Sequence, residues 1–132
     1  MFLQLPEGRR TGALAMKVGM ISVYDKWGIC HPTTVLQLDS CRVLQVKNEE
    51  TDGYTALQLG IGEAKRHKVK EPLRSHIKKW SGDANPPRQI QEFRVTKDCL
   101  LEPGTLVQAM HFVPGQVSRF NLWGLFACFT FI

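Results

Sequence analysis

The sequence has few of the residues that build disulfide or zinc scaffolds. Its 132 residues include four cysteines, Cys30, Cys41, Cys99 and Cys128, and none of them forms a Cys-x-x-Cys pair. Disulfide-rich secreted folds and zinc ribbons need denser or more closely spaced cysteines. We therefore expect reduced and mostly buried thiols, and neither a disulfide scaffold nor a structural zinc site.

Long apolar stretches are also missing. The opening residues, MFLQLPEGRR, are too short and, with Glu7, too acidic for a signal or transit peptide, so we expect no targeting presequence in this chain. The most apolar segment is the C-terminal run from Phe120 to Ile132, which is shorter than the roughly twenty residues that span a bilayer. A membrane-spanning helix is therefore not predicted.

Motifs of catalysis and cofactor binding are absent as well. Gly60 and Gly62 in GIGEAK follow an apolar run, but the segment lacks a third glycine and the ending of a phosphate-binding loop. The four histidines are scattered and have no neighbour at metal-ligand spacing. Ser75 and His76 are neighbours in sequence, which does not by itself arrange a catalytic nucleophile and its base in space. We expect no catalytic, cofactor-binding or metal-binding residues, and no enzyme.

The length of the chain suits about one globular domain. Positive charge, in contrast to the missing features, is concentrated in one part of it. The window from Glu63 to Trp80 holds seven basic and two acidic residues, a balance of +5 that equals the net charge of the whole chain. Its basic residues are Lys65, Arg66, Lys68, Lys70, Arg74, Lys78 and Lys79. Such a window is typical of a contact with nucleic acid or another anionic surface, and the alternative is a solvated face.

The segments before this window have the pattern of antiparallel β-strands. They are short apolar runs rich in Val, Ile, Leu and Thr, at residues 13–24, 31–38, 41–46 and 55–62. Asp25 and Gly28 fit the turn after the first run, and Asp52-Gly53 is a strong hairpin signal. The spacing indicates a mainly β fold, either a small barrel or a sandwich.

A short amphipathic helix is predicted within KEPLRSHIKKWSG. Leu73, Ile77 and Trp80 recur at i, i+4 and i+7, Pro72 fits the first turn, and Gly82 lies just past the end. The basic residues of this segment are then left on the outer side of the helix.

Two more strands are predicted after the helix, at residues 88–95 and 105–113. Pro103-Gly104 suits a type II turn between them.

Aromatic and histidine side chains accompany the charges. Trp80 is predicted either to stack on an exposed RNA base or to anchor the helix in the core through its spacing from Ile77. His67 and His76 add donors to an anionic surface, whereas His31 and His111 are expected on or beside strands. Lys and Arg contact phosphates without reading sequence, so structured RNA recognised by shape is the partner that these features favour.

Four segments of the chain occur in the order found in one protein family. They are RRTGALAMKVGM, VKNEETDGYTALQLGIGEAKRHKVKEPLRSHIKKW, QEFRV and HFVPGQ. Together they resemble the large-subunit ribosomal protein L three family over about residues 9–116, and RRTG, AMK and HFVPGQ are most similar to its mitochondrial branch. The combination is far more specific than any one motif.

The resemblance implies a translation-protein-type β-barrel, here incomplete, with a small α/β insertion whose basic helix covers about residues 63–85. It implies a non-catalytic structural constituent of the large subunit of the mitochondrial ribosome, in the matrix, that supports subunit assembly and translation. Its partners would be large-subunit ribosomal RNA and neighbouring ribosomal proteins, without a cofactor or small-molecule substrate. The RNA-binding residues expected from charge and resemblance are Arg9, Arg10, Lys17, Lys65, Arg66, Lys68, Lys70, Arg74, His76, Lys78, Lys79 and Trp80.

From Val117 onward the sequence departs from the family pattern. Members continue with a VDVTG-like strand and a GKGFQG-like segment that begins a long basic extension, whereas this chain reads VSRFNLWGLFACFTFI. We therefore predict an N-terminal body at residues 1–116 and a divergent hydrophobic tail at residues 117–132.

The tail admits two expectations. It is expected at most to form a substitute strand against the open barrel, through alternate side chains such as Leu122, Leu125 and Phe129. The alternative function is a membrane-associated interaction protein, in which the tail inserts into a bilayer and the basic window holds anionic lipid.

Overall fold

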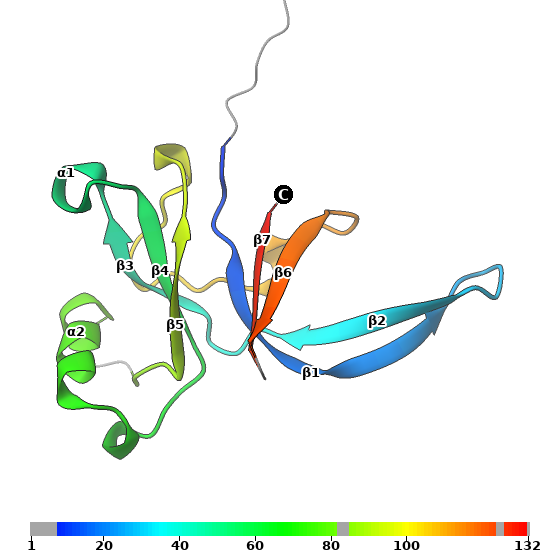
Figure 1. The fold of residues 1–132 in the computed structure, drawn as a ribbon, viewed down its shortest axis with the longest axis horizontal. Helices are drawn as coiled ribbons and strands as arrows, with labels where there is room; N and C mark the ends of the chain where they lie inside the picture. The colour runs from blue at the N-terminus through cyan, green and yellow to red at the C-terminus, as the bar shows by residue number, and fades with distance from the viewer. Residues whose placement is uncertain (1–7, 82–84, 124–125, 132) are drawn as a thin grey trace, which may run out of the picture.

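The chain folds mainly into β-structure. The computed structural model describes residues 8–81, 85–123 and 126–131, and in these residues seven strands form two antiparallel sheets (Figure 1). The sheets have the strand orders β2-β1-β7-β6 and β3-β4-β5. The strands are β1 (Ala13–Tyr24), β2 (Cys30–Gln37), β3 (Arg42–Lys47), β4 (Ala56–Ile61), β5 (Gln89–Arg94), β6 (Ser118–Trp123) and β7 (Phe126–Phe131). The helices are α1 (Glu49–Asp52) and α2 (Glu71–Ser81), with 3-10 turns η1 (Arg66–Lys68), η2 (Lys97–Cys99) and η3 (Ala109–His111).

The turn chemistry read from the sequence is confirmed. At the β1–β2 hairpin, Gly28 has a φ of 78° and its N–H donates to the Asp25 carbonyl at 2.8 Å. Between β3 and β4 the predicted hairpin contains the short helix α1, whose C-terminus is capped by Gly53 with a φ of 79°. Both positive φ values fall in the left-handed region that favours glycine.

The two sheets meet at the first residues of β1. Ala13, Leu14 and Ala15 are fully buried, and they pack in one hydrophobic cluster with residues of the β3-β4-β5 sheet. The other members of this cluster are Cys41, Val43, Leu57, Leu59, Ile61, Phe93, Val95, Val107 and Cys128. Burying a side chain such as Leu57 contributes about 1.5–3 kcal/mol, so this cluster is the main source of stability.

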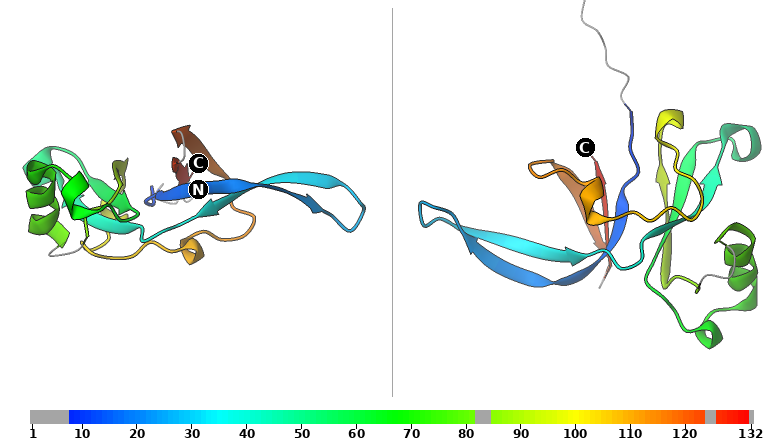
Figure 2. Two further views of the ribbon diagram at one scale, coloured as in Figure 1. Left: turned by 90° about the horizontal axis from the view of Figure 1, so that it is seen from below. Right: turned by 180° about the vertical axis from the view of Figure 1, so that it is seen from behind.

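The described strands do not close into a barrel. Residues 13–16 of β1 pair with β7, whereas residues 16–24 pair with β2. A register shift lies between Lys17 and Gly19, and beyond it the β1–β2 hairpin leaves the body (Figures 1 and 2). The expected incomplete barrel is therefore observed as two separate antiparallel sheets.

One predicted strand is wrong. Residues 105–113 make a single bridge, between Leu106 and Arg42, and then form η3. The burial here does not alternate as in a strand: Val107 is buried, but the three residues after it, Gln108, Ala109 and Met110, are all exposed. The preceding turn is as expected, because Gly104 has a φ of 88° and Thr105 donates to the Glu102 carbonyl at 3.2 Å.

The hydrophobic tail contributes two strands to the body. β7 pairs with both β6 and β1, and Ala13 lies opposite Phe129 while Leu14 lies opposite Cys128. The tail thus supplies a strand that pairs with the body, as expected. The side chains of Leu122, Leu125 and Phe129, which were expected to face the body, lie outside the described part of the structure.

The four cysteines are free thiols. Cys41 and Cys128 are buried, Cys99 is half-buried and Cys30 is exposed on the β1–β2 hairpin. Burial raises the pKa of the Cys41 and Cys128 thiols, which keeps both protonated and unreactive. In the described residues, no helix is long and apolar enough to cross a membrane.

Candidate nucleic-acid interface

The basic window folds into η1 and α2, on the face of the β3-β4-β5 sheet opposite β1 (Figure 1). α2 begins at Glu71 and Pro72. A helix N-terminus favours the negative charge of Glu71 and does not need the N–H that Pro72 lacks. The helix contacts β3. Ile77 is only 2% exposed and anchors the helix, whereas Leu73 is 39% exposed. The predicted helix is confirmed, while Gly82, its predicted stop, lies outside the described residues.

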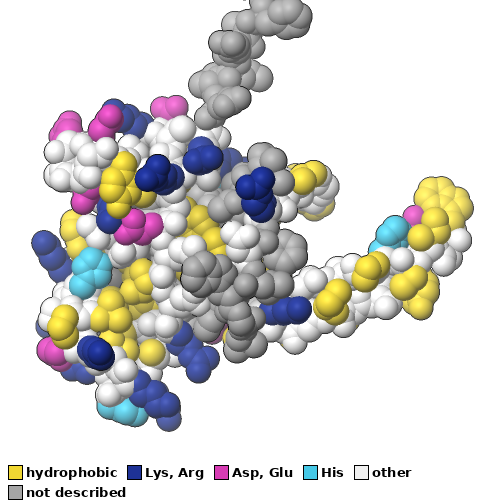
Figure 3. Space-filling view, viewed as in Figure 1, with side chains coloured by type: hydrophobic (Ala, Val, Ile, Leu, Met, Phe, Trp, Pro, Cys, Tyr) yellow, Lys and Arg dark blue, Asp and Glu magenta, His cyan; other side chains and the backbone are white. Residues whose placement is uncertain are grey.

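Six exposed cations lie just before η1, in η1, in the link after it and in α2. They are Lys65, Arg66, Lys68, Lys70, Lys78 and Lys79, and we call them the basic surface. In η1 the Lys68 N–H donates to the Lys65 carbonyl at 2.9 Å. Figure 3 shows Lys and Arg side chains spread over this edge of the molecule.

Arg74 joins η1 to α2 instead of facing solvent freely. Its Nη2 donates to the Arg66 carbonyl at 2.6 Å, and its Nη1 lies 3.0 Å from a carboxylate oxygen of Glu71. The guanidinium therefore holds the η1 backbone against the first turn of α2. In this structure Arg74 positions the basic surface.

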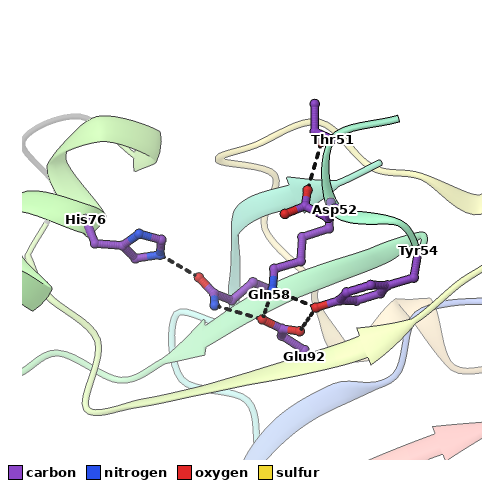
Figure 4. Close-up of polar contacts among 7 residues, drawn as sticks. Thr51, Asp52, Tyr54, Gln58, His76 and Glu92 are labelled. Atoms are coloured by element: carbon purple, nitrogen blue, oxygen red, sulfur yellow. Dashed lines mark hydrogen bonds and ion pairs between the residues drawn. The ribbon is translucent and has the colours of Figure 1, made fainter. Parts of the chain in front are cut away.

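His76 connects α2 to the underlying sheet (Figure 4). Its Nε2 lies 2.9 Å from Oε1 of Gln58 on β4, and the Gln58 amide donates to Glu92 on β5 at 3.4 Å. Glu92 also accepts from Lys47 Nζ at 2.7 Å and from the Tyr54 hydroxyl at 2.9 Å. A polar network thus fastens the basic helix to all three strands of the sheet.

The centre of this network is a charged pair. Partial burial raises the pKa of the Glu92 carboxyl, but hydrogen bonds from Lys47 and Tyr54 outweigh it and leave the pKa below its usual value. The hydrogen bond to Glu92 likewise raises the pKa of Lys47. Both groups are therefore charged at neutral pH.

We expect the stability of the fold to fall in acid partly through Glu92. Because the folded-state pKa of Glu92 is lowered, its contribution is full above the unfolded-state pKa and is lost as pH falls through the folded-state value. Thermal unfolding compared at pH 7 and pH 3 should show a smaller acid loss in Glu92→Gln than in the parent protein. Asp98→Asn, at an exposed position, is the control, and an equal acid loss in all three proteins would contradict this role.

Three cations outside the basic surface are paired with acids. The pairs are Arg42 with Glu63 at 3.6 Å, Lys47 with Glu92 at 2.7 Å and Lys97 with Glu49 at 2.6 Å. The two acids of the window, Glu63 and Glu71, are thus engaged by Arg42 and Arg74. Among the described residues, the side chains of Lys65, Arg66, Lys68 and Lys70 form no ion pair. Their positive charge is available to an external anion.

Trp80 lies at the end of α2 beside the cations. Lys79 Nζ is 5.3 Å from its ring centroid, and the ring is half-buried. The core anchor of the helix is Ile77, which is more deeply buried. Stacking of Trp80 on an RNA base stays a prediction.

The N-terminal residues expected to bind RNA do not join this surface. Arg9 and Arg10 are exposed just before β1, and Lys17 is half-buried in that strand. Arg10 Nη2 donates to the His111 carbonyl at 3.0 Å, and His111 Nε2 lies 3.0 Å from the Thr11 carbonyl. β1 and the segment before it lie on the side of the β3-β4-β5 sheet opposite α2 (Figure 1).

Local sequence patterns predict only part of the inward roles of Arg74 and His76. Both were expected to face an anion because they lie among lysines. The spacing of Glu71 and Arg74, at i and i+3 of a helix, is the signal that predicts their ion pair. For His76, whose partner is 18 residues away, no local signal exists.

The part of the chain that the structure describes contains no group of three His, Cys, Asp or Glu residues able to hold a metal ion. No model of a known protein family matches the chain.

Proposed function

We propose that this protein is a structural constituent of the large ribosomal subunit that binds ribosomal RNA and supports subunit assembly and translation. The observation that carries the proposal is the uncompensated charge of Lys65, Arg66, Lys68 and Lys70, held in place by Arg74 and His76. The order of motifs shared with the ribosomal protein L three family gives independent support.

The mechanism is electrostatic. Each lysine or arginine that meets a phosphate releases condensed counterions, so affinity falls with salt by roughly 0.7–0.9 log units per log of salt for each contact. Such contacts position the protein by the shape of the RNA backbone without reading bases. Fixing the cations through Arg74 and the His76 network lowers the conformational entropy that binding would otherwise cost.

The resemblance extends the proposal beyond the two sheets. It assigns β1 to β5 to part of a translation-protein-type barrel, and η1 with α2 to a small α/β insertion at about residues 63–85, of which 82–84 lie outside the described residues. It places the protein in the mitochondrial ribosome, beside neighbouring ribosomal proteins. The role is non-catalytic and needs no cofactor.

Reversing Lys65, Lys68 and Lys70 to Glu should weaken binding to a large-subunit ribosomal RNA fragment at least about tenfold near 0.15 M salt. Three phosphate contacts are removed, so the slope of log affinity against log salt should become shallower by about 2 to 3. Filter binding or fluorescence anisotropy over a salt series measures both quantities.

A charge-matched control variant distinguishes the loss of the basic surface from the effect of a changed net charge. Arg94, Lys97 and Arg119 are exposed outside the basic surface, and reversing them changes the net charge equally. This control should retain most of the affinity and the parent slope. Equal losses in the two triple variants, or no loss in either, would refute the assignment of the basic surface.

The membrane alternative has less support. The backbone of β7 is paired with β1 and β6, so the tail has partners within the chain. Lipid binding that depends on residues 117–132, in a protein that does not bind RNA, would favour the alternative; sedimentation with anionic liposomes measures it.

A further inference from the structure

The β1–β2 hairpin forms an arm that extends from the body. We define the arm as residues 17–37, and residues 20–33 within it are all exposed (Figures 1 and 2). Its strands stay paired from Lys17 opposite Leu36 to Tyr24 opposite Cys30. The arm is at the end of the molecule opposite α2 (Figure 1).

The arm is unusually apolar for an exposed ribbon. Most of the large apolar side chains on it are 45% to 71% exposed, namely Val18, Met20, Ile21, Val23, Tyr24, Trp27 and Ile29. A two-stranded ribbon buries little surface by itself and is marginally stable in water. Exposed apolar surface of this extent marks an interaction site.

The tip of the arm presents two aromatic rings and a cation. Tyr24 and Trp27 are 69% and 71% exposed, and Lys26 Nζ lies 4.1 Å from the Trp27 ring centroid. The turn is well defined, because the Asp25 carboxylate accepts from the Lys26 N–H at 2.7 Å and the Asp25 N–H donates to the Ile29 carbonyl at 3.0 Å. The rings are therefore displayed by a hydrogen-bonded turn.

The charges of the arm suit a polyanion. Asp25 is the only acidic residue between Ala13 and Gln37, and one of its carboxylate oxygens accepts the Lys26 N–H. Lys17 and Lys26 carry positive charge along the same ribbon. A base can stack on an exposed aromatic ring while the adjacent ammonium group meets its phosphate.

The geometry points to the arm tip as a second RNA contact, in which unpaired bases of a single-stranded RNA segment stack on Trp27 and Tyr24. This inference rests on the proposed function and adds to it the class of RNA recognised. Duplex RNA does not fit the tip, because its bases are already stacked and its deep groove is closed to side chains. A loop or unpaired strand offers the free faces that the rings require.

The test compares Trp27→Ala with Trp27→Phe in the full chain. A uridine-rich single-stranded dodecamer and a duplex of equal length are the probes, and binding is followed by anisotropy. Trp27→Ala should bind the single strand roughly 5- to 100-fold more weakly, while Trp27→Phe keeps a ring and most of the affinity. Duplex binding should be unchanged, and so should the salt slope, because stacking releases few counterions.

Met110→Ala, an exposed apolar position 88% accessible outside the arm, is the matched control and should bind as the parent does. Unchanged single-strand affinity in Trp27→Ala overturns the arm contact. The proposed function still stands in that case if the Lys65, Lys68 and Lys70 reversal weakens binding, and it fails with the arm contact if neither variant does. Self-association in sedimentation velocity that Trp27→Ala abolishes, with unchanged RNA binding, assigns the arm to a protein partner and also overturns the inference.

Discussion

Gly60→Val should destabilise the fold by about 3 kcal/mol. A Cβ at Gly60 would lie 2.8 Å from Cβ and Cγ of Pro87 and 2.9 Å from Cδ1 of Leu44. These distances are shorter than non-bonded carbon atoms adopt in proteins. Pro87 has little freedom to move away, because the Arg88 N–H donates to the Ile61 carbonyl at 2.9 Å and the Pro86 carbonyl accepts from Ala64 at 2.8 Å. Chemical denaturation followed by far-UV circular dichroism measures the loss.

Gly19→Val is the control for this substitution. Gly19 also lies in a strand, but a Cβ there meets nothing within 4 Å and its φ is not positive. A β-branched residue at such a position should leave stability nearly unchanged or slightly increased. Equal stability of the two variants would show that Pro87 does not pack on β4 as described.

Cys128→Asp should cost about 3 kcal/mol or more, because it places an unpaired carboxylate in the hydrophobic core. Cys128 is 7% exposed, belongs to the main cluster and lies opposite the fully buried Leu14. The substitution tests whether the hydrophobic tail is an integral part of the fold. Denaturation midpoints and the oligomeric state after refolding report the effect.

The matched control for this prediction is Asn121→Asp on the neighbouring strand β6. Asn121 on β6 pairs directly with Cys128 but is exposed, so Asn121→Asp adds the same charge in solvent. This variant should unfold within about 0.5 kcal/mol of the parent. If Cys128→Asp were equally benign, β7 would not be packed on the body.

Local patterns were sufficient for most elements of the fold. The apolar runs and turn residues predict β1 to β5 closely, and the spacing of Ile77 with Pro72 predicts α2. These features depend on side chains near one another in sequence. The strand expected at residues 105–113 failed because its composition is strand-like while its burial does not alternate.

Contacts between residues far apart in the chain could not be predicted from local sequence patterns. That β1 divides its pairing between β7 and β2 depends on segments more than a hundred residues apart. The same is true of the candidate site: charge identified Lys65 to Lys79, but the contacts of Arg74 with the Arg66 carbonyl and of His76 with Gln58 depend on tertiary structure. Trp27 was overlooked because a tryptophan in a turn gives no local indication of how exposed it will be.

The arm also sets the reach of the molecule. Its paired strands extend over eight residues of β1, or roughly 26 Å at about 3.3 Å per residue. If both ends bind RNA as proposed, the tip and the basic surface form a bivalent ligand whose spacing is set by the arm. Once one end is bound, the other meets its own segment at an effective concentration set by that spacing, so two modest contacts yield avidity without either being tight. Under the proposed function, selectivity would then come from the distance between two RNA elements, which the folding of the RNA defines.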